Sequence, residues 1–326
     1  MTGGRRRGVG MGVEASGETA ARGAERLERA LSPLGARARF QESLARFTSL
    51  RVGGPADAFV RAESVADIAT TLAAADSVGA PVFVLGGGTN LLVSDRGVRG
   101  VVLTLGRAFD YARWTSAGEE VAVSIGAASR VGRVVRRAVA AGLGGLETAE
   151  GIPGTVGGGL LMNAGAYGVE IGELVTEVRG VASDGSEMRL GREGLGFGYR
   201  QARLPAGFVV TEVGLRLQRA PRQDLRERML AARARREASQ PKGHPSAGSM
   251  FKNPPGDFAA RLIEAAGLKG TQLGQVQISS KHANFFVNLG GGRAGEVRAL
   301  MDLAQRRVWE RFHAWLEPEV RLVGQW

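Results

Sequence analysis

Two segments of the chain carry apolar residues at the spacing of one helical face. They span residues 64–77 and 129–141, and Ser64 stands where a capping residue begins a helix. We therefore expect two amphipathic helices, each with one buried side. The inward-facing residues are predicted to be Val65, Ile68, Leu72 and Ala73 in the first helix and Val131, Val134, Val135 and Val139 in the second.

Short apolar or alternating runs, separated by glycine and proline, predict strands around these two helices. A rise in charge density after residue 220 predicts a further helix and a domain boundary. The expected strands are 58–61, 81–85, 91–95, 101–105, 119–125, 175–182, 187–190, 209–217, 284–289 and 319–324, and the further helices are 19–34, 221–239, 258–266 and 295–314.

The composition limits the class of protein. A chain of 326 residues with 44% hydrophobic and 23% charged residues is long enough for two or three soluble domains. The absence of cysteine excludes disulfides, thiolate metal sites and cysteine nucleophiles. The three histidines, His244, His282 and His313, are far apart and form no zinc pattern, so we expect no metal site.

The net charge of +11 raises the question of an anionic partner. Arginine dominates, and its planar guanidinium suits phosphate and carboxylate groups. A nucleic-acid partner is not expected, because only 6% of residues are aromatic and none are interleaved with the basic residues. A binder of RNA or of an acidic protein stays open as the alternative from another functional class.

The N-terminal segment predicts neither export nor a membrane anchor. Residues 1–17 are basic but precede no apolar core, and no apolar run reaches the length of a membrane span. We therefore expect a cytoplasmic protein without a membrane partner. Residues 1–40 are expected to be a leader that is partly disordered.

Three glycine-rich segments are candidate anion sites. Residues 86–90, GGGTN, follow a strand and predict either a nest of N–H groups for a pyrophosphate or a tight turn. Residues 151–158, GIPGTVGG, precede a short apolar helix and favour a plain helix start over an anion site. Residues 290–295, GGGRAG, match a dinucleotide-binding fingerprint but lie too near the C-terminus for that fold, so we expect a loop.

Polar candidates for chemistry gather in the second half. In residues 246–254, SAGSMFKNP, Gly248 and the proline predict that the Ser249 hydroxyl is displayed on a shaped loop. Arg200, in FGYR, is either a carboxylate ligand or a solvated side chain. In WLEPEVR, Glu317 and Glu319 lie two residues apart in a strand-like segment, so either could line a cleft.

GGGTN, GIPGTVGG, GYR, SAGSMFKNP and LEPE occur in this order, and with them the chain resembles the UDP-N-acetylenolpyruvoylglucosamine reductase family from about residue 41 onward. The short link between residues 217 and 246 resembles the type II branch, which lacks a tyrosine-bearing lid. The resemblance implies an α+β fold with an FAD-binding region of the vanillyl-alcohol oxidase type. It places FAD-binding subdomains at 41–106 and 107–219 and a substrate domain at 220–326.

The resemblance also implies non-covalently bound FAD, with NADPH as co-substrate. The FAD-binding residues that it implies are Gly86, Gly87, Gly88, Thr89, Asn90, Leu91, Ile152, Pro153, Gly154, Val156, Gly157 and Gly158, with Arg51, Asn163 and Gly165 nearby. Catalytic roles fall on Arg200, Ser249 and Glu319. Substrate binding falls on Tyr199, Arg236, Lys252 and Asn253, with Arg236 facing the diphosphate.

The reaction implied by the family is reduction of UDP-N-acetylglucosamine enolpyruvate to UDP-N-acetylmuramate for peptidoglycan, by a protein expected to be a monomer. Arg200 would stabilise the anion that forms after hydride transfer, Ser249 would donate the proton, and Glu319 would orient the intermediate. A flavin-dependent oxidase of a small alcohol or sugar is the rival on the same scaffold, because GGGTN serves both.

Overall fold

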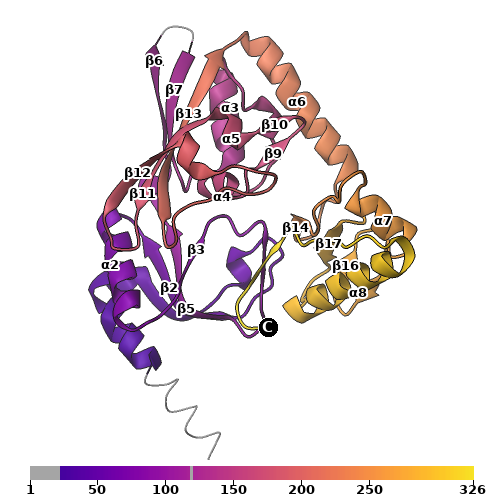
Figure 1. Ribbon diagram of the computed structural model, residues 1–326, viewed down its shortest axis with the longest axis horizontal. Helices are drawn as coiled ribbons and strands as arrows, with labels where there is room; N and C mark the ends of the chain where they lie inside the picture. The colour runs from indigo at the N-terminus through magenta and orange to yellow at the C-terminus, as the bar shows by residue number, and fades with distance from the viewer. Residues whose placement is uncertain (1–22, 118–119) are drawn as a thin grey trace, which may run out of the picture.

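The structure is a computed structural model that describes residues 23–117 and 120–326. Its strands form three main sheets, and helices pack on each sheet, so the fold is α+β as the resemblance implied (Figure 1). In Figure 1 the chain runs from the first sheet at lower left to the second above it, and then to the third at the right.

The first sheet has the strand order β1-β2-β5-β3. β1 pairs with β2 in antiparallel fashion, whereas β2 and β3 both pair with β5 in parallel. The predicted helix is α2, which Ser64 caps by accepting a hydrogen bond from the Asp67 amide. Ala73, expected on its inward face, is exposed, and Ala74 and Ala75 are buried instead. The elements are β1 (Ala38–Ser43), β2 (Pro55–Ala62), α2 (Val65–Ser77), β3 (Val82–Leu85) and β5 (Val98–Leu105).

Part of the segment expected to be a leader belongs to this first unit. Residues 23–31 are helical, and a 3-10 helix, Ser32–Arg37, follows. Leu27, Leu31 and Leu34 are buried in the same core cluster as α2. The helix predicted at 19–34 is thus confirmed over residues 23–31, and residues 23–37 pack with the first unit. Residues 1–22 lie outside the described part of the chain.

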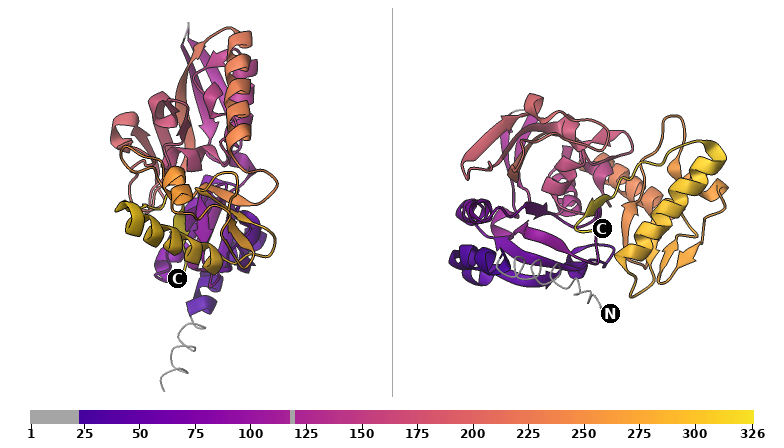
Figure 2. Two further views of the ribbon diagram at one scale, coloured as in Figure 1. Left: turned by 90° about the vertical axis from the view of Figure 1, so that its right-hand side faces the viewer. Right: turned by 60° about the horizontal axis from the view of Figure 1, so that its bottom comes forward.

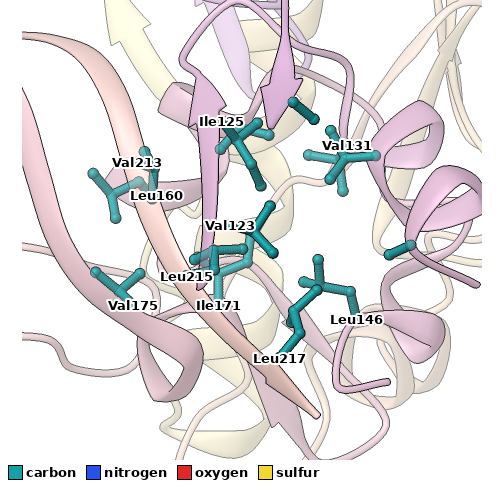
Figure 3. Packing of buried hydrophobic residues seen from close by; sticks show 14 of the residues in the cluster. Val123, Ile125, Val131, Leu146, Leu160, Ile171, Val175, Val213, Leu215 and Leu217 are labelled. Atoms are coloured by element: carbon teal, nitrogen blue, oxygen red, sulfur yellow. The ribbon is translucent and has the colours of Figure 1, made fainter. Parts of the chain in front are cut away.

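The second sheet is antiparallel and has the order β12-β11-β13-β7-β6, with β8 also paired to β13. Its core lies against α3, whose four predicted inward valines are all buried. Figure 3 shows Val123 and Leu215 of the sheet packing near Val131 of α3 and Leu146. The strands are β6 (Ala112–Ala117), β7 (Glu120–Gly126), β8 (Leu143–Gly144), β11 (Val175–Val181), β12 (Glu187–Gly191) and β13 (Val209–Arg219).

Short elements complete this second unit and carry the chain toward the site. A two-stranded hairpin of β9 and β10 lies beside the helices α4 and α5 (Figure 1). The elements are α3 (Val131–Ala140), α4 (Val156–Leu161), β9 (Gly165–Ala166), β10 (Val169–Glu170) and α5 (Ile171–Leu174), with 3-10 helices at Arg107–Phe109, Glu147–Ala149 and Arg192–Leu195. A further 3-10 helix, Ala45–Phe47, lies between β1 and β2 of the first unit.

The long helix α6 leads from the second sheet to the third, which has the order β14-β17-β16-β15 (Figures 1 and 2). α7 and α8 share an apolar core with this sheet. The elements are α6 (Arg222–Ser239), β14 (Ser246–Ser249), α7 (Ala259–Ala265), β15 (Gln272–Leu273), β16 (Val276–Ile278), β17 (Phe285–Asn288) and α8 (Ala294–Phe312).

Residues 290–293 of the fingerprint-like segment form a loop, as expected, and residues 294 and 295 begin α8. The amides of Ala294 and Gly295 donate to the two carboxylate oxygens of Asp95, each at 2.9 Å. A carboxylate at a helix N-terminus is electrostatically favourable. Because Asp95 already occupies this end of α8, the loop serves to join the third unit to the first.

A closing strand returns the chain to the first unit. β18 (Arg321–Val323) pairs in parallel with β4 (Leu91–Val93), which directly follows the GGGTN turn. Figure 1 shows this yellow strand lying beside the first unit, away from the rest of the third. Within the described residues, no helix combines the length and the apolar character needed to span a membrane.

Candidate active site

The two glycine segments expected to bind FAD lie against each other. A Cβ atom on Gly87 would lie 2.6 Å from the Gly154 Cα, and one on Gly154 would lie 2.7 Å from the Thr89 Oγ1. Real side chains do not approach backbone this closely, so only glycine allows the contact. The fold thereby brings residues 86–90 and 151–158, from two different units, into one surface.

The GGGTN turn has the donors that an anion needs. Within the described chain, the N–H groups of residues 86–90 donate to no protein acceptor. The start of α4 differs, because the amides of Val156, Gly157 and Gly158 donate to Ser129, Ala127 and the Thr155 hydroxyl. The turn therefore fits the pyrophosphate of FAD, and α4 is the plain helix start that the sequence favoured.

Adding a methyl group at Gly87 should separate the two segments. We expect Gly87→Ala to retain less flavin through gel filtration and to lose about 1–3 kcal/mol of stability through overpacking. Gly194→Ala is the matched control, because a Cβ on Gly194 would meet no atom within 4 Å. Equal flavin content in the two variants would contradict the role given to this contact.

Two cavities adjoin beside this surface. The first lies between the first and second units and is lined by Gly86, Gly157 and Gly158. The second is lined by Arg200, Lys252 and Glu319, among others. Leu161, Leu204 and Phe208 line both cavities. The cavity at the glycine segments and the cavity at Arg200 and Glu319 therefore share an apolar boundary.

Hydrogen bonds connect the glycine turn to the third unit. The Asn90 side-chain amide donates to the Glu319 carbonyl at 3.0 Å, and the Glu319 amide donates to the Met250 carbonyl at 2.9 Å. Ser249 directly precedes Met250, and an isolated bridge pairs Phe251 with Pro318. The segment that carries Ser249 is therefore held beside the segment that carries Glu319.

The sequence predicted that Ser249 lies on a loop, but in the structure it belongs to a strand. It ends β14, where it lies opposite Phe285 of β17, and its side chain is half-buried. The pairing of β14 shifts register between Ser246 and Ser249, and Gly248 between them has a φ of +80°. An irregular strand, rather than a loop, therefore sets the position of this hydroxyl.

Arg200 and Glu319 form an ion pair across the site. The Arg200 Nε lies 3.0 Å from the Glu319 Oε1, and the two side chains are only 24% and 17% exposed, so water screens the pair weakly. Arg200 has a φ of 57° in a tight turn closed by Gly198 and Gln201. The two candidate catalytic residues, 119 positions apart, thus meet in the structure.

Asn163 positions this turn rather than presenting its amide to a cofactor. Its Nδ2 donates to the Gly198 carbonyl at 3.1 Å and to the Glu170 carboxylate at 2.5 Å. Its Oδ1 accepts from the Gly172 amide at 2.9 Å. These protein partners use both donors of a buried side chain, so Asn163 supports Arg200 indirectly.

Burial makes the charged form of Glu319 more costly than it is in water. Burial raises the pKa of this carboxyl above its ordinary value, and the charge and hydrogen bond of Arg200 offset part of that rise. Lys252 also lowers the pKa of Glu319 through its charge. A carboxyl that holds its proton more tightly repels a nearby anion less, which suits a site where negative charge develops.

This raised pKa predicts how stability depends on pH. The folded chain binds the Glu319 proton more tightly than the unfolded chain, so the resulting stability is present below the unfolded pKa and is lost as pH rises through the folded pKa. Glu319→Gln, which stays neutral, should melt above wild type at about pH 8, and the difference should close toward about pH 4. Glu317→Gln, at an exposed carboxylate, is the control, and a constant offset across pH would contradict the prediction.

Arg236 is a cation near Arg200 whose guanidinium forms no salt bridge with the described residues. Its Nε is buried and has no hydrogen-bond partner, and its side chain lies against Gly151. Burial lowers the pKa of Arg236, and the nearby charge of Arg200 lowers it further, although arginine stays protonated at neutral pH. A half-buried guanidinium with a buried, unbonded Nε suits an anionic group of a substrate.

The remaining candidates take up different positions. Tyr199 is half-exposed and lies under the Arg200 guanidinium, 5.1 Å from it. Lys252 pairs with Glu317 at 2.5 Å, and Asn253 accepts a hydrogen bond from Ala259 at the start of α7.

The other FAD candidates lie in several segments. Arg51 is exposed, in a segment whose Ser49 amide donates to the Gly88 carbonyl. Of the remaining FAD candidates, Gly165 pairs with Glu170 in the β9–β10 hairpin, Leu91 begins β4, Ile152 is half-buried, and the Pro153 carbonyl accepts from Thr89.

Comparison with known proteins agrees with this geometry. Residues 56–191 match a model described as an FAD binding domain, so the fold and the paired glycine segments define a flavoprotein. Residues 240–323 match the C-terminal domain of UDP-N-acetylenolpyruvoylglucosamine reductase. The chain belongs to the UDP-N-acetylenolpyruvoylglucosamine reductase family.

Individual relatives cover nearly the whole chain. A UDP-N-acetylenolpyruvoylglucosamine reductase from Rubrobacter xylanophilus is 45% identical over 88% of this chain and 96% of its own length. A second, from Symbiobacterium thermophilum, is 45% identical over 92% of this chain and 96% of its own. The crystal structure of the Thermus caldophilus enzyme has 38% identity and a TM-score of 0.74, covering 88% of this chain and 98% of that one.

Proposed function

We propose that this chain reduces the enolpyruvyl group of UDP-N-acetylglucosamine enolpyruvate to give UDP-N-acetylmuramate, with NADPH as reductant and FAD as cofactor. The observation that carries the proposal is the pair of adjoining cavities. One is lined by the glycine segments, the other by Arg200 and Glu319, and they share the wall of Leu161, Leu204 and Phe208. Because these residues line both cavities, the two cavities adjoin, and a cofactor ring in one could contact an alkene in the other where they meet.

Bound FAD would accept a hydride from NADPH and supply it to the substrate. Once hydride reaches the terminal vinyl carbon, negative charge develops on the adjacent carbon and its carboxylate. The guanidinium of Arg200, fixed by Glu319 at 3.0 Å, would stabilise that charge. Its planar donors match a carboxylate in two-point fashion, which also orients the substrate.

A proton must then reach the carbon that carries the ether oxygen. Ser249 is the proposed donor, because it lies next to Met250, whose carbonyl holds the Glu319 backbone. Glu319 in its neutral form would complete the site without repelling the anion. Lys252, Tyr199 and Asn253 are proposed to contact the substrate, and Arg236 to bind its diphosphate.

The three units described above support separate domains for FAD binding and substrate binding. We assign FAD binding to subdomains 41–106 and 107–219 and substrate binding to 220–326, with residues 23–40 added to the first and β18 contributed back to it. We further propose that the protein acts as a monomer in the cytoplasm, without a nucleic-acid or membrane partner.

One experiment separates this function from its rivals. The purified protein should be yellow, NADPH should bleach the flavin, and UDP-N-acetylglucosamine enolpyruvate should restore the colour without oxygen. A protein that reoxidises only with oxygen and accepts electrons from a small alcohol would be the oxidase instead. A colourless protein that binds RNA in a salt-sensitive way would refute both flavin readings.

A further inference from the structure

Arg130, which was not among the residues predicted from the sequence, lies beside the glycine turn. It is the residue just before α3, and its backbone bridges to Thr155, with the Val131 amide donating to the Gly154 carbonyl. Its Nη1 lies 3.3 Å from the position that a Cβ on Gly87 would take. Arg130 also lines the cavity between the first and second units.

The guanidinium of Arg130 has no direct partner among the described residues, although its charge helps to lower the pKa of Asp110. Among the described residues, its guanidinium makes no hydrogen bond or salt bridge. The other arginines of α3 all have partners: Arg133 pairs with Asp110, Arg136 pairs with Glu150, and Arg137 stacks on Trp114. Arg130 is therefore the arginine of this helix that remains available to a ligand.

Asp110, a carboxylate in the lining of this cavity, already accepts hydrogen bonds from other side chains. Asp110 lines the cavity but accepts hydrogen bonds from Arg133 and from the Ser129 hydroxyl. Although burial alone would raise the pKa of Asp110, these bonds lower it, so the group stays ionised and bound to them. With Asp110 held by Arg133, no acidic side chain in residues 23–117 and 120–326 forms an ion pair with Arg130.

Backbone N–H donors and the Arg130 guanidinium therefore lie together at the GGGTN turn. The N–H groups of residues 86–90 lack acceptors among the described residues, and Arg130 reaches the middle of that turn. Backbone N–H groups fix an anion's position, and a guanidinium adds charge and two further donors. A pyrophosphate is the part of FAD that needs both.

We propose that Arg130 is a positioning residue for FAD, whose guanidinium binds the cofactor's pyrophosphate over the GGGTN turn. The inference rests on the proposed function only in requiring that the chain bind FAD. It predicts that Arg130 contributes to affinity for the phosphates and not to binding of the flavin ring.

The test compares apoproteins of wild type, Arg130→Gln, Arg130→Lys and Arg137→Gln by titration with FAD and with riboflavin, which lacks phosphate. Arg130→Gln should weaken FAD binding by about 10- to 100-fold, as for a lost charged hydrogen bond, with Arg130→Lys in between. Riboflavin affinity should stay equal to wild type. Arg137→Gln, on the same helix and outside the cavity, should bind FAD within about twofold of wild type.

Salt and folding provide two further readouts. The FAD affinity of wild type should fall more steeply with added salt than that of Arg130→Gln, because one ionic contact is missing in the variant. Equal melting temperatures of the apoproteins would show that folding is intact. FAD binding by Arg130→Gln equal to that of Arg137→Gln, or an equal salt dependence, would overturn the proposal while leaving the enzyme's function standing. A wild type that binds no FAD would refute the function itself.

Discussion

Replacing Ser249 with alanine should abolish most of the second half-reaction while leaving the first almost untouched. Reduction of FAD by NADPH needs no proton from this hydroxyl, so its rate should stay within about twofold of wild type. Reoxidation by UDP-N-acetylglucosamine enolpyruvate should slow by about 10²–10⁴-fold, the usual contribution of a positioned proton donor. Stopped-flow measurement of flavin absorbance follows the two halves separately.

Ser246→Ala is the control for this experiment. Ser246 lies in the same strand, β14, and its hydroxyl accepts a hydrogen bond from the Gly248 amide. A change in the strand alone would therefore affect both variants. If Ser249→Ala damaged both half-reactions equally, the hydroxyl would have a structural role and not that of a proton donor.

Arg200→Gln is expected to give the second large effect. Without the guanidinium, the developing carboxylate anion loses its main stabilising charge, and the second half-reaction should slow by about 10²–10³-fold. Because Arg200 also lowers the pKa of Glu319, its removal should raise that pKa further. Any limb of the pH–rate profile that reports Glu319 should accordingly move to higher pH.

Two further variants test whether the effect of Arg200 depends on its charge, on its planar shape or on the stability of its loop. Arg200→Lys keeps the charge but loses the planar fork, so it should recover only part of the rate. Arg203→Gln removes an exposed arginine three residues further along the same loop and should behave like wild type. Equal losses in Arg200→Gln and Arg203→Gln would attribute the effect to the loop's stability.

The sequence predicted the parts of this fold that depend on local pattern. The helix at 129–141 was correct because its valines recur at helical spacing, and all four are buried in α3. The assignment of the helix at 64–77 was also correct, although its inward face was wrong at Ala73. Alanine is small enough to lie on either side of a helix edge, so its pattern carries little directional information.

The sequence did not predict features that depend on distant contacts. Ser249 was expected on a loop, because a four-residue strand of serine, alanine and glycine lacks the β-branched signal of a strand. The Arg200–Glu319 pair joins positions 119 apart, and only the family resemblance suggested that both belong to one site. Arg130 was one basic residue among several in an amphipathic segment, and its neighbour Gly87 is supplied by another unit.

The contact between Asn90 and Glu319 spans 229 residues of chain, which has a consequence for biosynthesis. At about 5–20 residues per second, the ribosome delivers Glu319 roughly 10–45 s after Asn90. The glycine turn and residues 56–191 are then already translated, whereas the strand that carries the chain back to the first unit is still missing. The pairing of β18 with β4 is therefore a late step, and the catalytic pocket can be completed only near the end of synthesis.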